Sequence, residues 1–234
     1  MPRALQKRSA SVSVDALLAD STWFRQINEA ARQQVRADIV ERSISAGESL
    51  DHQGESQRHW YGVLEGLLKW SINAHDGRTV TLGGQSAGSW FGEGTLLREQ
   101  PRRADLVALR HSRVAMLPFE TFDWLRRTEA EFNEFLLRQI NERLHWFMGN
   151  FAAHRLLDTD RLVARALVGL VHPLLNPRGE RYLTISQEEL ANLATLSRQR
   201  CNRSLMAMKR EGLVQLAYGA IVVVDLDALQ RRAE

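Results

Sequence analysis

Short apolar runs punctuated by glycine fill the chain from residue 47 to residue 117, and a helical pattern follows them. Val80 and Leu82 alternate with threonines, as expected of a half-buried strand. Ten of the 15 glycines lie between Gly47 and Gly94. The pattern predicts strands at 60–64, 67–72, 79–82 and 105–117, preceded by a helical stretch at about 14–37. Many short strands separated by glycine are typical of a small β-barrel or jelly roll.

The segment after Pro118 has a different periodicity. From residue 119 to residue 157 it contains no proline and a single glycine, Gly149. Apolar residues recur at spacings of 3, 4, 3 and 4, at Leu137, Ile140, Leu144, Phe147 and Phe151. This spacing is that of the seam in a two-stranded coiled coil. It predicts a long helix at 119–157 through which the chain forms a homodimer; packing of the helix on its own domain is the alternative.

The last part of the chain, from 158 to 234, predicts a second domain built around two short helices. Ser186 and Glu189 form the S-x-x-E pattern of a capping box at the start of one helix. Ser197 can cap a second helix, which Gly212 would terminate. Residues 184–213 therefore predict a helix-turn-helix. Apolar runs on both sides of Tyr218-Gly219 predict a hairpin after it, which is the wing of a winged helix.

The second of these helices has two distinct faces. Cys201, Leu205 and Met208 follow a helical repeat and are predicted to face the core. The opposite side carries arginine, which can grip guanine in the major groove, and glutamine and asparagine, which can do the same for adenine. No acidic residue occurs from Arg198 to Arg210. A solvated basic helix is the alternative, but it leaves the capping box and the hairpin unexplained. The predicted DNA-binding residues are Ser197, Arg198, Gln199, Arg200, Asn202 and Arg203.

Composition narrows the function further. The formal net charge of +3 permits nucleic-acid binding without demanding it. The single cysteine, Cys201, excludes an internal disulfide and an iron–sulfur cluster within one subunit, and it suits a cytoplasmic setting. No apolar stretch approaches the roughly 20 residues that span a bilayer. Residues 1–13 lack the apolar core of a secretory signal and are predicted to be a disordered basic tail. The phosphate-binding loop, the dinucleotide fingerprint, the nucleophile elbow and the zinc-protease motif are missing from the sequence, so we do not expect an enzyme or a protein metal site.

Several local motifs together resemble the Crp/Fnr family of bacterial transcription regulators over nearly the whole chain. They are Gly47-Glu48-Ser49-Leu50, Phe91-Gly92-Glu93 followed by Arg103-Ala104, Leu157-Asp158 and the segment 196–203. The resemblance implies an α+β protein with a cyclic-nucleotide-binding-type β-roll at 14–118, a dimerisation helix at 119–157 and a winged helix-turn-helix at 158–234. It further implies a homodimer on a two-fold DNA site, with RNA polymerase as a candidate partner. Gln199 stands where the family commonly has glutamate, so we expect a DNA half-site that differs from the best-known one of the family.

The resemblance also implies an effector site. Glu93 would bind the ribose hydroxyl and Arg103 the cyclic phosphate of a nucleotide. Ala104 lacks the hydroxyl usual at its position, and Phe147 and Met148 replace a polar pair that contacts the purine. Since unpaired polar groups cost affinity, we expect cyclic AMP not to be a tight effector. The candidate effector-site residues are Gly92, Glu93, Arg103, Ala104, Phe147 and Met148.

Several alternatives remain open for this site, and the sequence does not identify the effector. Glu93 and Arg103 can instead form a structural ion pair. The protein can respond to a cyclic nucleotide after all, bind an apolar effector near Trp146, or bind DNA constitutively above a vestigial pocket. Haem sensing through His145 or His154, and redox sensing through Cys201, are further alternatives that the sequence supports less well.

Overall fold

The computed structural model describes residues 11–74, 76–156, 158–172, 174–176 and 181–234. Most of the predicted tail, residues 1–10, lies outside the described residues. The chain then forms three short helices, α1 (Val14–Asp20), α2 (Thr22–Gln26) and α3 (Glu29–Asp38), where one helical stretch was predicted. Ser21 and Asn28 interrupt it because both adopt extended backbone angles, and the Asn28 side chain caps α3 by accepting from the Ala31 N–H.

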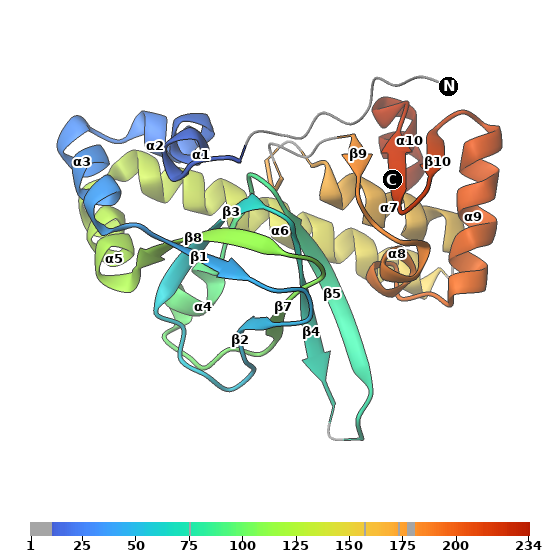
Figure 1. Ribbon diagram of the computed structural model, residues 1–234, viewed down its shortest axis with the longest axis horizontal. Coiled ribbons are helices and arrows are strands. Elements are labelled where there is room, and N and C mark those ends of the chain that lie inside the picture. The colour runs from blue at the N-terminus through green and yellow to red at the C-terminus, as the bar shows by residue number, and fades with distance from the viewer. Residues whose placement is uncertain (1–10, 75, 157, 173, 177–180) are drawn as a thin grey trace.

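Two four-stranded antiparallel sheets form the β-roll (Figure 1). The first sheet has the order β1 (Val40–Ile44), β8 (Ser112–Pro118), β3 (His59–Glu65), β6 (Trp90–Phe91). The second has the order β2 (Ser49–Asp51), β7 (Asp105–Ala108), β4 (Leu67–Asn73), β5 (Thr79–Ser86). The predicted strand at 105–117 is thus two strands, because a turn at residues 109–111 carries the chain from one sheet to the other. A short helix, α4 (Glu93–Arg98), follows β6.

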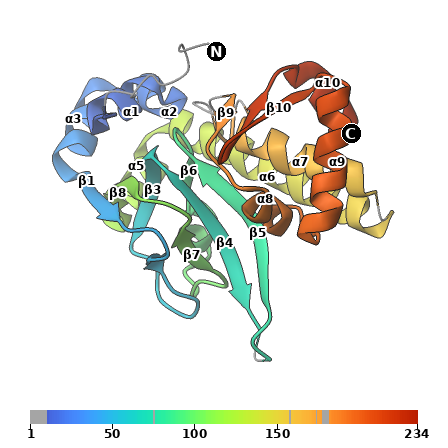
Figure 2. The same cartoon turned by 45° about the vertical axis from the view of Figure 1, so that its right-hand side comes forward.

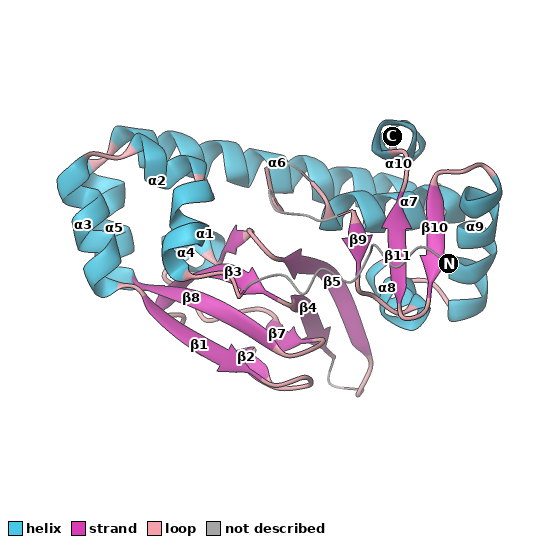
Figure 3. Ribbon diagram, turned by 45° about the horizontal axis from the view of Figure 1, so that its top comes forward, coloured by secondary structure: helices cyan, strands magenta, loops and turns pink. Residues whose placement is uncertain are grey.

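The predicted helix at 119–157 is also two elements, α5 (Phe119–Thr128) and α6 (Ala130–Arg155). The chain bends at Glu129, whose backbone is extended. Its carboxylate accepts hydrogen bonds from the backbone N–H of Asn28 at 3.1 Å and from the Asn28 side-chain amide. A contact to the N-terminal helices therefore holds Glu129 outside the helix. The much longer α6 runs along the molecule from the β-roll to the C-terminal domain (Figure 3).

The C-terminal domain packs around α7 (Thr159–Leu170), which Asp158 caps by accepting from the Arg161 N–H. The elements after it are β9 (Tyr182–Leu183), α8 (Gln187–Leu193), α9 (Arg198–Arg210), β10 (Val214–Ala217), β11 (Ala220–Val223) and α10 (Leu226–Ala233). The three strands form one antiparallel sheet in the order β10-β11-β9. This is the helix-turn-helix and wing that the sequence predicts, with a final helix that it did not.

The two domains touch directly as well as sharing α6. Strand β5 lies beside α8 (Figure 2), and the Arg110 guanidinium on the β7–β8 turn lies 3.2 Å from the Glu189 carboxylate on α8. The Ser86 hydroxyl donates to the Leu170 carbonyl at 3.0 Å. A side chain at Gly84 would come within 2.7 Å of the Leu170 side chain, so glycine permits this close approach. The β4–β5 hairpin therefore packs on the C-terminal domain.

Candidate nucleic-acid interface and sensor pocket

The start of the helix-turn-helix is fixed by the predicted capping box. The Ser186 hydroxyl accepts from the Glu189 N–H at 3.1 Å, and the Glu189 carboxylate accepts from the Ser186 N–H at 2.7 Å. The Ser197 hydroxyl caps α9 in the same way through the Arg200 N–H. Between the helices Thr195 has φ of 52°, a left-handed conformation that costs a β-branched residue energy. Its hydroxyl lies 2.7 Å from His154 Nε2, so the end of α6 helps to hold the turn.

The inner face of α9 anchors the helix firmly. Cys201, Leu205 and Met208 are fully buried, which confirms the predicted core face. Burial raises the pKa of the Cys201 thiol to about 11. The Ser204 hydroxyl donates to Asp160 on α7, and that carboxylate also binds Arg232 of α10 at 2.9 Å. Helix α9 is thus tied to two other helices and presents its remaining side in a fixed orientation.

The outer face of α9 carries the predicted base-reading residues. Arg198, Gln199 and Arg203 are exposed. Helix α9 itself lies at the end of the molecule away from the β-roll (Figure 1). Two other predicted residues have intramolecular partners. The Asn202 amide donates to Gln187 on α8 at 2.7 Å, and the Arg200 guanidinium donates to the Thr159 hydroxyl at 2.7 Å. Their expected roles in DNA binding remain predictions that require these two bonds to be exchanged for DNA contacts.

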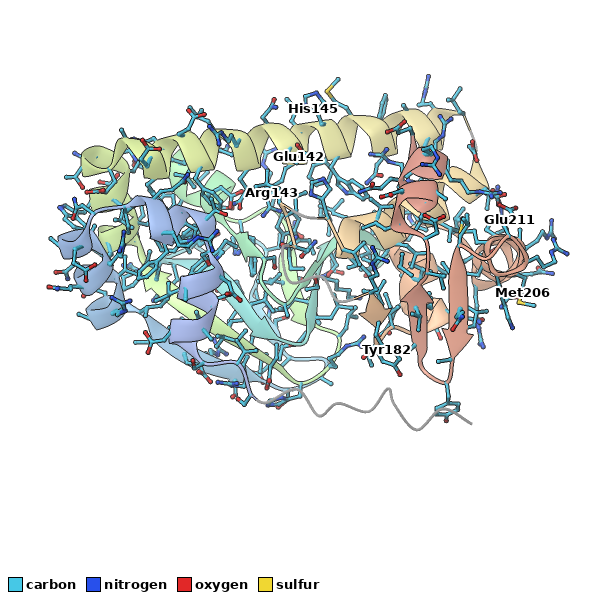
Figure 4. All side chains as sticks on the ribbon, turned by 90° about the horizontal axis from the view of Figure 1, so that it is seen from above. Glu142, Arg143, His145, Tyr182, Met206 and Glu211 are labelled. Atoms are coloured by element: carbon cyan, nitrogen blue, oxygen red, sulfur yellow. The ribbon has the colours of Figure 1, made fainter. Side chains whose placement is uncertain are left out.

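One exposed residue of this face was missed. Met206 is 43% exposed and points outward from α9 (Figure 4). Its position among the basic residues could have been read from the helical repeat, because Met206 lies one turn beyond Asn202 and Arg203. The wing also has an exposed tip: Tyr218 is fully exposed where β10 turns into β11.

A cavity of about 320 Å³ lies between the β-roll and α6. Gly92, Glu93, Arg103, Ala104 and Phe147 line it, so the structure brings five of the six candidate effector-site residues together. Met148 is not among the residues lining this cavity and is 59% exposed. Met148 therefore lies outside this cavity in the single chain, and its role in an effector site stays a prediction.

We call residues 91–104 the cassette, and its glutamate, Glu93, already has partners within the chain. Glu93 is buried, and its carboxylate accepts from Arg143 Nε of α6 at 2.9 Å and from the Trp60 indole at 3.3 Å. Arg143 points from α6 toward the β-roll (Figure 4), where it also donates to the Trp90 carbonyl at 2.6 Å. Its guanidinium lies 5.3 Å from the centre of the Trp70 ring. The structural ion pair anticipated for Glu93 thus exists, but its partner is Arg143 rather than Arg103.

The buried arginine of the cassette is Arg102. Arg103 is exposed, whereas Arg102 is only 7% exposed and pairs with Asp51 at 2.9 Å. The Tyr61 hydroxyl donates to the same carboxylate at 2.7 Å, and burial followed by the charge on Asp51 raises the pKa of that phenol. Two adjacent arginines give the sequence no signal about which one turns inward, because the register of this loop depends on its tertiary contacts.

The predicted seam of α6 is exposed in the single chain. Leu137, Ile140, Leu144, Phe147 and Phe151 are between 37% and 67% exposed. Beside the seam, Gly149 lets the Arg165 guanidinium of α7 approach the helix, where it lies 4.7 Å from the centre of the Trp146 ring. Trp146 therefore packs α6 against α7. Within the described part of the chain, no helix has the length and apolarity to cross a membrane, and no cluster of side chains could hold a metal ion.

A β-roll with a nucleotide-type cassette, joined by a long helix to a winged helix-turn-helix, defines a transcription regulator with a sensor domain. Residues 41–129 match a family model described as a cyclic nucleotide-binding domain, and residues 154–232 match one described as a Crp-like helix-turn-helix domain. The transcriptional regulator LdrP of Thermus thermophilus is 30% identical over 191 residues, which cover 80% of this chain and 93% of that protein. The chain therefore belongs to the Crp/Fnr family of transcription regulators.

Two further similarities agree with this assignment. The CRP-like cAMP-activated global transcriptional regulator of Mycobacterium tuberculosis is 24% identical over 223 residues, covering 94% of this chain and all of that protein. The structure of FixK2 from Bradyrhizobium japonicum superimposes with a TM-score of 0.68 at 16% identity, covering 84% of this chain and 98% of that one, and supports the fold alone. The curated relatives named here are transcriptional regulators rather than enzymes.

Proposed function

We propose that the protein is a sequence-specific DNA-binding regulator that acts as a homodimer on a two-fold DNA site. The observation that carries the proposal is the outer face of α9, where Arg198, Gln199 and Arg203 are exposed while the inner face is locked into the domain. These side chains are able to bind guanine and adenine edges in the major groove. Gln199 supplies both a donor and an acceptor, so we propose a half-site read differently from one read by glutamate.

The proposed dimer rests on the exposed seam of α6. Five large apolar residues in a heptad repeat are costly to leave in water, and a second copy of the same helix would bury them. Half-sites would then lie about 10 base pairs apart from centre to centre.

For the sensor pocket we propose that cyclic AMP is not a tight effector. The Glu93 carboxylate, which the resemblance assigns to the ribose hydroxyl, is held by Arg143 and Trp60. A ribose hydroxyl would therefore compete with two donors that already neutralise and orient this carboxylate. The alternative, a cyclic-nucleotide-responsive regulator, is favoured by the activation of the mycobacterial relative by cAMP. Titration calorimetry separates the two, since micromolar binding of cyclic AMP to the purified protein would favour the alternative.

Selection of binding sites from random duplex DNA tests DNA recognition. We expect enrichment of an inverted repeat, and binding that weakens steeply as salt rises, because phosphate contacts release counterions. Arg203→Ala should relax the preference at one position of each half-site and cost about 1–3 kcal/mol of binding free energy. The matched control is Arg138→Ala, an exposed arginine on α6 that should leave the selected site unchanged. Recovery of no enriched sequence from the wild-type protein would contradict the proposal.

A further inference from the structure

The one large apolar side chain exposed on α9 is Met206. The other large apolar residues of that helix, Leu205 and Met208, are fully buried, whereas Met206 is 43% exposed. Figure 4 shows it pointing away from the domain. A single exposed apolar residue needs no explanation in general. The position of Met206 on α9, however, gives a functional reason for its exposure.

Met206 lies on the same stripe of α9 as Gln199. Seven residues make nearly two turns of an α-helix, so the two side chains point in directions that differ by only about 20°. Arg203 lies one turn before Met206 and Arg210 lies one turn after it, both exposed. A groove that receives Gln199 therefore also faces Met206, with positive charge on both sides.

We propose that Met206 contacts the 5-methyl group of a thymine in the same major groove. This inference rests on the proposed function of α9. A thioether has no charge and accepts hydrogen bonds only weakly, so Met206 is poorly suited to bind a phosphate. The thymine methyl is the apolar group that the major groove offers, and methionine is flexible enough to pack against it.

The length of the helix places the contact. Seven residues rise by about 10.5 Å along an α-helix. Because the two side chains are this far apart along α9, Met206 would meet a different base pair from the one read by Gln199 in the same half-site.

Deoxyuridine substitution tests the contact, because uracil lacks only the 5-methyl group. Each thymine of the selected half-site is replaced in turn, and the Kd is measured for the wild-type protein, Met206→Ala and Met206→Gln. For the wild type we expect about a fourfold loss of affinity at one thymine, the value of one buried methyl group. Both variants should bind thymine and uracil there equally. The control variant Leu97→Ala, which changes an exposed residue of α4, should keep the wild-type pattern.

The outcomes separate this inference from the function on which it rests. If the wild-type protein selects a site but Met206→Ala keeps the full sensitivity to uracil, the methyl contact is wrong and DNA recognition stands. The same conclusion follows if no thymine of the half-site is sensitive. If Met206→Ala changes transcription while its DNA affinities match the wild type, Met206 contacts a protein partner instead. If the wild-type protein selects no site, the proposed function itself fails.

Discussion

Replacing Arg143 by methionine should destabilise the sensor domain strongly. Methionine keeps an unbranched stem on α6 but removes the guanidinium that binds Glu93 at 2.9 Å. The side chain of Glu93 is only 3% exposed, so its carboxylate would keep a single donor, the Trp60 indole. Removal of one partner from a buried ion pair costs about 3–5 kcal/mol, because the other charge stays buried without compensation.

Urea unfolding followed by tryptophan fluorescence measures this cost. Three of the six tryptophans, Trp60, Trp70 and Trp90, contact the pair and contribute to this signal. Protein concentration must be held fixed, since dimerisation would add to the apparent stability. Arg138→Met is a matched control: it removes an arginine from the same helix, but its partner Glu134 is half exposed, and the loss should be below about 0.5 kcal/mol. Equal losses in the two variants would refute the energetic reasoning.

The same pair predicts how the pocket responds to a nucleotide. In Arg143→Met the Glu93 carboxylate is free to accept from a ribose hydroxyl. A hydrogen bond to a charged group is worth about tenfold in affinity. We therefore expect the variant to bind cyclic AMP more tightly than the wild type in titration calorimetry. Adding Glu93→Gln removes the stranded charge, so the double variant should lose less stability than the two single changes added together, and it should lose the tenfold gain. A wild-type affinity equal to that of Arg143→Met would show that the pair does not occlude the site.

Three further changes follow from other parts of the structure. Burial raises the pKa of Cys201 to about 11, so the folded protein should react slowly with a thiol reagent at pH 8 and fast in urea; fast reaction of the folded form would contradict its burial. Burial lowers the pKa of His172 below its ordinary value of 6.5 against the opposing charge of Glu142, so the unfolded chain takes up the proton first. Stability should therefore fall as pH drops below about 6.5, and His172→Asn should flatten that loss in urea titrations. Ser186→Ala should cost about 1 kcal/mol in thermal unfolding by removing one half of the capping box, whereas an unchanged transition would exclude a stabilising role for the cap.

Features that depend on neighbouring residues could be predicted from the sequence. The capping box at Ser186 and the buried face of α9 at Cys201 each follow from side chains within two helical turns. Local spacing determines such features directly, because hydrogen bonds at helix ends and helical faces repeat over three to seven residues.

Features that depend on distant partners could not be predicted. The bend at Glu129 is held by Asn28, which is 101 residues away in the chain. The partner of Glu93 is Arg143, 50 residues away on another element, although Arg103 lies nearer in sequence. In both cases the sequence shows a charged residue without showing which of many opposite or polar partners the fold brings beside it.

The short segment from Glu142 to Trp146 on α6 contacts the sensor pocket and the DNA-binding domain and contributes to the exposed seam. Glu142 lies 3.0 Å from His172 Nε2, just beyond the end of α7. Arg143 binds Glu93 in the sensor pocket, and Leu144 belongs to the exposed seam. Trp146 packs beneath the Arg165 guanidinium of α7. These four residues occupy little more than one helical turn. The sensor pocket and α7 of the DNA-binding domain therefore contact the same turn of α6.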